Sequence, residues 1–225
     1  MAHILENPIW WALNDNCKHL GQGTDQVKRF HPDVAPFAAV IADAPDNFQT
    51  LFNQIQEEQV VVMFSPKPDF DPAPLSIIAN IPGIQMVFEG KLETSDNSDE
   101  IVDLGEEEVS QMIALTQIAQ PGPFSKRTIE FGAYNGIYDG ESLVAMAGER
   151  LRAGQFTEIS AVCTHPDYAG KGFARKLVMH RVEAIIASGR IPYLHVKSDN
   201  ARAINLYERL GFVTHSDMNF YILKR

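Results

Sequence analysis

The stretch YAGKGFARKL at residues 168–177 constrains the fold more than any other, because two glycines flank a lysine directly before a long helical pattern. The apolar residues of this pattern recur at intervals of three and four: Ala174, Leu177, Val178, Val182, Ile185 and Ile186. The spacing predicts an amphipathic helix, with Gly189 as its C-terminal stop. A strand is expected over Phe156–Thr164, so the stretch lies in a strand–loop–helix unit.

A glycine loop in this position either binds a phosphate or packs closely against a neighbouring strand. A P-loop would need glycine at His165 and serine or threonine at Gly172, so it is excluded. A dinucleotide fingerprint would need glycine or alanine at Arg175 and an acidic residue about twenty positions later, so it is weak. Two interpretations remain. The loop binds a pyrophosphate through backbone N–H groups at the helix start, or it is a packing turn without a ligand.

Charge is distributed unevenly along the chain. The net charge of −10 disfavours nucleic-acid binding driven by phosphate neutralisation, and residues 96–108 form a dense acidic run. Basic residues gather in the C-terminal part: Lys171, Arg175, Lys176, Arg181, Arg190, Lys197, Arg202 and Arg209. This part of an acidic protein is therefore expected to attract an anionic ligand.

Length and cysteine content limit the class of protein. A chain of 225 residues makes one large domain or two small ones, and it contains no apolar run of membrane-spanning length. The N-terminus lacks the basic and apolar regions of a signal peptide. Cys17 and Cys163 lie far apart, which fits a reducing cytoplasm and excludes metal sites built on paired cysteines. We therefore expect a cytoplasmic protein without a membrane span or a metal.

The polar, acidic segment Glu93–Glu100 is the best candidate for a boundary. It predicts an N-terminal α/β domain over 1–98 and a second domain over 101–225. The elements expected in the first are a helix over Asp46–Glu58 and strands over Val60–Phe64 and Ile84–Phe88. No residues in 1–95 have the spacing of a catalytic motif.

The second domain has clearer patterns. Glu106–Glu108 suit the first turn of a helix, and Asp139-Gly140 is a hairpin signal. The elements expected after that helix are, in order, strands Gly132–Tyr138, Ser142–Leu151 and Phe156–Thr164, the helix before Gly189, strand Ile191–Val196, helix Asn200–Leu210, and strands Phe212–Val213 and Phe220–Leu223. The order is that of a mixed α/β (α+β) fold.

Two segments resemble the GNAT superfamily of acyl-CoA-dependent N-acetyltransferases: EISAVCTHPDYAGKGFA at 158–174 and NARAINLYERLGF at 200–212. The second matches the family signature through Asn200, Ala203, Tyr207, Gly211 and Phe212. The sequence around them is similar to the glycine N-acyltransferase-like branch, and the likeness is strong over about 121–225. The resemblance implies a mostly antiparallel twisted sheet flanked by helices, with residues 1–95 as a degenerate partial copy.

The resemblance also implies the ligands. Acetyl-CoA, or another acyl-CoA, is the expected co-substrate, without a metal. The expected acceptor is a small-molecule amine or amino acid. We expect no nucleic-acid or membrane partner, and a monomer or homodimer.

The same resemblance assigns cofactor contacts. The predicted set is Val162, Cys163 and Thr164 for the pantetheine arm, Gly170, Lys171, Gly172, Phe173, Ala174 and Arg175 for the pyrophosphate, and Asn200 and Ala203 near the second motif. An N–H at Val162 would polarise the thioester carbonyl. One departure is Ala169, where the family has glutamine or arginine, so a side-chain contact to phosphate is missing; Lys171 or Arg175 are candidates to replace its charge.

Glu158 and Tyr207 are the candidate catalytic residues. Glu158 is proposed as a water-mediated general base, and the alternative is a structural carboxylate paired with an arginine such as Arg150. Tyr207 is proposed as the general acid, a role compatible with a core aromatic. Because side chains alternate unless a bulge intervenes, Glu158, Ser160, Val162 and Thr164 are expected on one strand face, with Cys163 on the other as a small core residue.

The sequence therefore predicts an N-acetyltransferase in which an amine attacks the thioester directly. The alternative is a non-catalytic acyl-CoA-binding or regulatory module, suggested by Ala169 and by the motif-poor N-terminal half.

Overall fold

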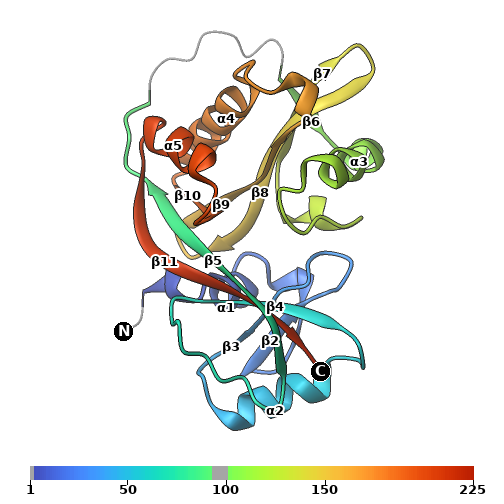
Figure 1. Cartoon of the computed structure of the whole chain (residues 1–225), viewed down its shortest axis with the longest axis vertical. Coiled ribbons are helices and arrows are strands. Elements are labelled where there is room, and N and C mark those ends of the chain that lie inside the picture. Colours follow the sequence, from blue (N-terminus) through green and yellow to red (C-terminus); the bar gives the residue numbers. More distant parts are fainter. Residues whose placement is uncertain (1–2, 93–100) are drawn as a thin grey trace.

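The structure is a computed structural model, and it describes residues 3–92 and 101–225 (Figure 1). The predicted boundary at Glu93–Glu100 lies outside these residues. The helices are α1 Pro8–Asn14, α2 Pro45–Gln54, α3 Val109–Ala119, α4 Phe173–Ala187 and α5 Ala201–Arg209, with short 3₁₀ turns η1 Ile4–Glu6, η2 Lys18–Leu20, η3 Glu106–Glu108, η4 Thr128–Phe131 and η5 Pro166–Tyr168. The strands are β1 Gly21–Gly23, β2 Val27–Phe30, β3 Ala38–Val40, β4 Val60–Ser65, β5 Ser76–Phe88, β6 Val102–Leu104, β7 Tyr134–Asp139, β8 Ser142–Ala153, β9 Phe156–Thr164, β10 Ile191–Lys197 and β11 Phe212–Lys224.

An eight-stranded sheet in the order β4-β11-β5-β10-β9-β8-β7-β6 forms the centre of the molecule. Among the described strands of this sheet, only β9 and β10 pair in parallel, and the other neighbours run antiparallel. A small sheet, β1-β2-β3, belongs to the N-terminal half. The predicted mixed, mostly antiparallel fold is confirmed.

Helices cover both faces of the sheet (Figure 1). On one face α4 and α5 bury Val178, Val182 and Tyr207 against the strands. On the other face α3 buries Met112 and Leu115. The loop between β9 and α4 therefore leads from the sheet to the layer formed by α4 and α5.

Strands β9 and β10 stay paired only from Ile191↔Phe156 to Tyr193↔Glu158. After Tyr193, β10 continues along β5, and β9 continues along β8. The two strands diverge as a result, which opens the centre of the sheet beside the C-terminal half of β9.

A bulge changes the face of β9 after Ser160. Ala161 has a φ of 53°, and the β8 ladder steps from Gly148↔Ser160 to Met146↔Cys163. Val162 therefore packs on the α4 side, and Cys163 packs beside α3. The predicted alternation was wrong beyond Ser160, since the extra residue of a bulge reverses the side-chain directions that follow it.

Strand β5 of the N-terminal half lies between β10 and β11, so one sheet crosses the predicted division into domains 1–98 and 101–225, which stays a prediction. The two strands predicted over Phe212–Val213 and Phe220–Leu223 are one strand, β11, which stays paired with β5 on both sides of a register shift between Thr214 and Ser216. Among the described residues, no helix combines the length and apolar character needed to cross a membrane.

Candidate active site

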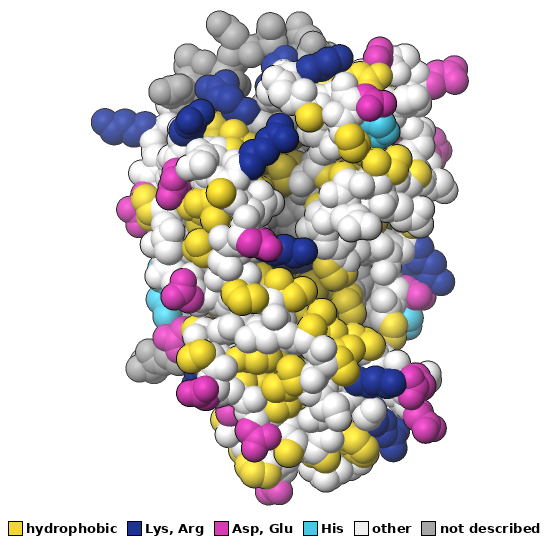
Figure 2. Space-filling view, viewed as in Figure 1, with side chains coloured by type: hydrophobic (Ala, Val, Ile, Leu, Met, Phe, Trp, Pro, Cys, Tyr) yellow, Lys and Arg dark blue, Asp and Glu magenta, His cyan; other side chains and the backbone are white. Residues whose placement is uncertain are grey.

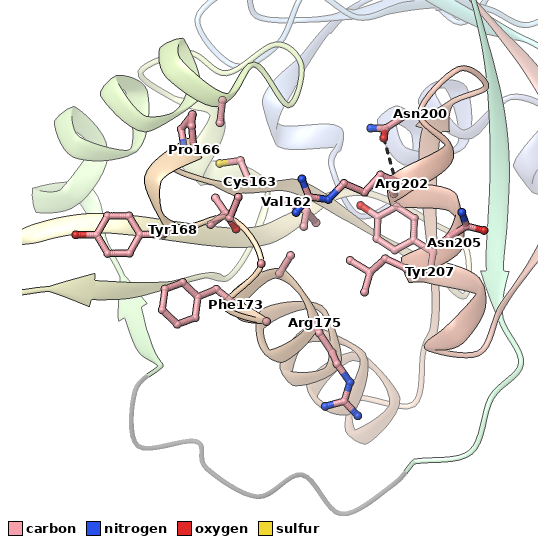
Figure 3. A pocket seen from close by; sticks show the side chains of 18 of the residues that line it. Val162, Cys163, Pro166, Tyr168, Phe173, Arg175, Asn200, Arg202, Asn205 and Tyr207 are labelled. Carbon is pink, nitrogen blue, oxygen red and sulfur yellow. Dashed lines mark hydrogen bonds between the residues drawn. The ribbon is translucent and has the colours of Figure 1, made fainter.

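A cleft of about 1060 Å³ opens between the end of α3, the diverging end of β9, the start of α4 and one side of α5 (Figure 3). Its lining residues are Ile118, Ala119, Val162, Cys163, Thr164, Pro166, Tyr168, Ala169, Gly170, Gly172, Phe173, Ala174, Arg175, Asn200, Arg202, Ala203, Asn205, Leu206, Tyr207 and Arg209. The two motifs of the sequence therefore form opposite walls of one cavity.

The glycine loop exposes its backbone to this cleft. Gly170 and Gly172 have φ values of 86° and 82°, and a side chain added at either would meet nothing within 4 Å. Gly172 is the N-cap of α4 and offers no side-chain cap. The first N–H groups of α4 are thus free to bind an anion, with the positive end of the helix dipole behind them.

Tyr168 holds the loop in place. Its hydroxyl donates a hydrogen bond to Asp139 Oδ2 at 2.6 Å, which ties η5 to the β7–β8 hairpin. The ammonium of Lys171 lies 4.3 Å from the centre of the Tyr168 ring. Lys171 is not among the residues that line the cleft, and its charge lies against the Tyr168 ring instead.

Helix α5 presents Tyr207 to the cleft. The Asn200 side chain caps the helix by accepting the Ala203 N–H at 3.1 Å. Tyr207 is 8% exposed, and burial, with a smaller contribution from Cys163, raises the pKa of its hydroxyl to about 12. Burial likewise raises the pKa of the Cys163 thiol to about 12. Both groups therefore stay protonated at neutral pH.

Glu158 lies in the interior rather than on the cleft wall. Its carboxylate accepts hydrogen bonds from Arg150 Nε at 2.8 Å and Arg150 Nη2 at 2.5 Å, and His195 Nδ1 lies 2.7 Å away. Burial opposes its ionisation, but Arg150 and His195 outweigh burial and lower the pKa of Glu158 to about 2. The N-terminal half covers this pair, since Phe37 and Phe64 pack on the Arg150 guanidinium.

His195 links Glu158 to the N-terminal half. Gln85 Nε2 donates to the Leu5 carbonyl at 3.0 Å and lies 2.9 Å from His195 Nε2. Because an amide nitrogen only donates, we assign His195 Nε2 as the acceptor and His195 Nδ1 as the donor to Glu158. A buried polar chain therefore runs across β5, β10, β9 and β8.

The cleft brings together Val162, Cys163, Thr164, Gly170, Gly172, Phe173, Ala174, Arg175, Asn200, Ala203 and Tyr207 of the predicted site residues. Lys171 and Glu158 do not line it. Arg202, Asn205 and Arg209 line it without having been predicted as cofactor contacts, as do Ile118 and Ala119 of α3. The basic C-terminal composition and the helical spacing of Arg202 and Arg209 were the available signals.

The residues present fit an acyl-CoA. The loop offers open space at both glycines for a phosphate, and the diverging strands leave a wall at Val162–Thr164 for an extended arm. No cluster of three or more His, Cys, Asp or Glu side chains suited to a metal ion occurs in residues 3–92 and 101–225.

Known proteins share this architecture. A family model described as FR47-like protein matches residues 134–221. A crystal structure described as an acetyltransferase from the GNAT family, from Novosphingobium aromaticivorans, shares 34% sequence identity, covers 100% of this chain and 99% of that chain, and has a TM-score of 0.92.

Two curated relatives match part of the chain. A ribosomal protein bS18-alanine N-acetyltransferase from Salmonella typhimurium is 30% identical over 106 residues, 44% of this chain and 70% of the relative. The N-alpha-acetyltransferase RimI of Mycobacterium tuberculosis is 37% identical over 82 residues, 35% of this chain and 51% of the relative, so the chain spans about half the length of that protein. With the whole-chain match in fold and sequence, the chain belongs to the GNAT superfamily of acyl-CoA-dependent N-acetyltransferases.

Proposed function

We propose that this protein transfers an acetyl group from acetyl-CoA to a primary amine by direct attack on the thioester. The observation that carries the proposal is the cleft in which the glycine loop, the diverging end of β9 and Tyr207 meet. The co-substrate supplies an activated acyl group, so the protein has to hold it, receive the amine and manage two protons.

In this proposal the loop N–H groups between Gly170 and Ala174 bind the pyrophosphate, and the backbone of Val162–Thr164 pairs with the pantetheine arm. An N–H at Val162 polarises the carbonyl oxygen of the thioester. Tyr207 donates a proton to the departing thiolate, and its raised pKa keeps that proton in place until then. The amine nitrogen forms the new C–N bond as the C–S bond breaks.

Glu158 has two candidate roles in this scheme. As a general base it would accept the amine proton through a water, and its low pKa keeps it ionised at neutral pH. As a structural carboxylate it would neutralise Arg150, which its two short hydrogen bonds favour. The low pKa also makes it a weak base, so the structural role has the stronger support.

Paired variants separate these roles. Glu158→Gln removes both functions, whereas Arg150→Gln combined with Glu158→Gln removes the ion pair as a unit. If Glu158 is the base, both variants lose turnover by about 100-fold or more. If Glu158 only neutralises Arg150, the double variant recovers wild-type turnover.

The acceptor is proposed only as a primary amine. The names of similar proteins include a ribosomal-protein alanine and spermidine as acetylated groups. An α-amine, an amino acid and a polyamine therefore belong in the same screen. The narrower resemblance to the glycine N-acyltransferase-like branch, the oligomeric state and the cytoplasmic location stay predictions.

Calorimetry and a thiol-release assay test the proposal. Acetyl-CoA should give binding heat, while ATP and NAD should give none, and one or more amines in the panel should release CoA thiol. Binding of acetyl-CoA without thiol release across the panel would instead support the non-catalytic acyl-CoA-binding module. Absence of binding heat with acetyl-CoA would exclude both functions.

A further inference from the structure

The glycine loop carries less side-chain charge toward the cleft than its motif leads one to expect. Ala169 lines the cleft with a methyl group, at the position where the family pattern has glutamine or arginine. Lys171 is stacked on Tyr168 and does not line the cleft. Backbone N–H groups alone would then face the charge of two or more phosphates.

Arginines on both helices surround the same space. Arg202, Leu206 and Arg209 lie at intervals of four and three on α5, so they share a helix face, and all three line the cleft. Arg175 lines it from the first turn of α4. Figure 3 shows Arg202 extending from α5 into the cleft and Arg175 extending from α4.

Among the described residues, no internal partner accounts for these arginines. Within residues 3–92 and 101–225, no carboxylate forms an ion pair with Arg175, Arg202 or Arg209. Figure 2 shows Lys and Arg side chains gathered around the hollow in the upper half of a molecule whose net charge is −10. Like charges placed together repel one another, and an anion between them removes that cost.

We propose that Arg175, Arg202 and Arg209 bind the phosphates of the acyl-CoA, and that they supply the side-chain charge that Ala169 does not provide. The proposal rests on the proposed function, because it concerns the same co-substrate. Guanidinium groups suit this task, since their planar forks donate two parallel hydrogen bonds to phosphate oxygens. The two helices, and not the loop, therefore supply the positive side-chain charge, and the phosphates are held between α4 and α5.

Affinity measurements on single variants test the assignment. Arg175→Gln, Arg202→Gln and Arg209→Gln should each weaken acetyl-CoA binding by about tenfold, as expected for loss of a charged hydrogen bond. Lys18→Gln is the matched control, because Lys18 is exposed, basic and in the N-terminal half, which contributes no described residue to the cleft lining. The affinity of the Lys18→Gln variant for acetyl-CoA should equal that of the wild type.

Two further arms locate the phosphate and test the replacement. Dephospho-CoA lacks the 3′-phosphate. Substituting an arginine that binds this phosphate should weaken the binding of CoA but not that of dephospho-CoA. Substituting an arginine that binds the diphosphate should weaken the binding of both. Introducing a cation with Ala169→Arg in the Arg202→Gln background should recover most of the affinity that Arg202→Gln removes.

The outcomes distinguish the two proposals. Wild-type affinity in all three arginine variants, with normal binding by the wild type, would overturn the phosphate assignment and leave the proposed function standing. Failure of the wild type to bind either form of CoA would overturn both. If Ala169→Arg raises the affinity in the Arg202→Gln background but not in the wild type, the result would support most directly that the arginine replaces the missing loop charge.

Discussion

The Arg150 guanidinium donates two hydrogen bonds to the Glu158 carboxylate, at 2.5 and 2.8 Å, and both groups are withdrawn from water: the Glu158 side chain is 0% exposed and that of Arg150 12%. Loss of one member of such a pair leaves an uncompensated buried charge, whereas loss of both leaves a neutral site. The pair therefore ties the stability of the sheet to two particular residues.

Glu158→Gln should lower the free energy of unfolding by about 3 kcal/mol, because Arg150 is left buried without its counter-ion. Urea denaturation measures this change. The double variant Arg150→Gln/Glu158→Gln should recover more than half of the loss. Equal stabilities for the single variant and the wild type would show that the pair contributes little.

Stability should fall in acid because of Glu158. Its pKa of about 2 in the folded protein lies below the ordinary value of 4.5, so the stabilisation is present above about pH 4.5 and is lost as the pH falls toward 2. Thermal melting between pH 6 and pH 2.5 measures this loss. The Arg150→Gln/Glu158→Gln variant should show a shallower decline over the same range.

Tyr207→Phe should reduce kcat about 100-fold while leaving the affinity for acetyl-CoA within about twofold, because the ring keeps its packing against Phe212. Since the pKa of Tyr207 is about 12, its ionisation should not limit kcat between pH 6 and pH 10. Steady-state kinetics across this range, with calorimetric Kd values, measure both. A variant with wild-type kcat would remove Tyr207 from the proton transfer.

Tyr168→Phe should weaken acetyl-CoA binding about threefold, because the variant cannot form the hydrogen bond to Asp139 that positions the glycine loop. The phenyl ring still supports the Lys171 ammonium, so the variant isolates the hydroxyl. Calorimetry measures the affinity, and a melting temperature close to that of the wild type establishes that the fold is intact. No change in Kd would mean that the loop keeps its conformation without the hydrogen bond to Asp139.

Gly172→Ala should weaken acetyl-CoA binding, because the added methyl group occupies open space at the anion-binding end of α4. The positive φ also costs roughly 1 kcal/mol of stability. Gly189→Ala is the matched control: its φ of 77° imposes the same strain, its Cβ meets nothing within 4 Å, and it lies outside the cleft lining. Binding should be unchanged in the control and reduced at least tenfold in Gly172→Ala.

The sequence predicted most elements of the C-terminal half, because local patterns determine them. The helix after the glycine loop runs from Phe173 to Ala187, and the hairpin at Asp139-Gly140 joins β7 to β8. The periodicity of apolar residues and the glycine at each turn are sufficient for such elements.

Features that depend on contacts between distant segments were not predictable in the same way. The bulge at Ala161 reverses the faces of Val162 and Cys163, and nothing in the residue types marks it. The insertion of β5 between β10 and β11 depends on pairing between residues far apart in the chain. For Glu158, the sequence named Arg150 as a partner but gave no sign that Phe37 and Phe64 would enclose the pair.

The position of β5 sets a limit on how this protein can be divided. Both neighbours of β11 in the sheet, β4 and β5, come from the N-terminal half. A recombinant fragment beginning at residue 101 would therefore leave a 13-residue strand with two open edges, which favours aggregation over folding. Co-expression of residues 1–92 with residues 101–225 would instead allow the two polypeptides to reassemble as a split enzyme, held together by the pairing of β11 with β4 and β5.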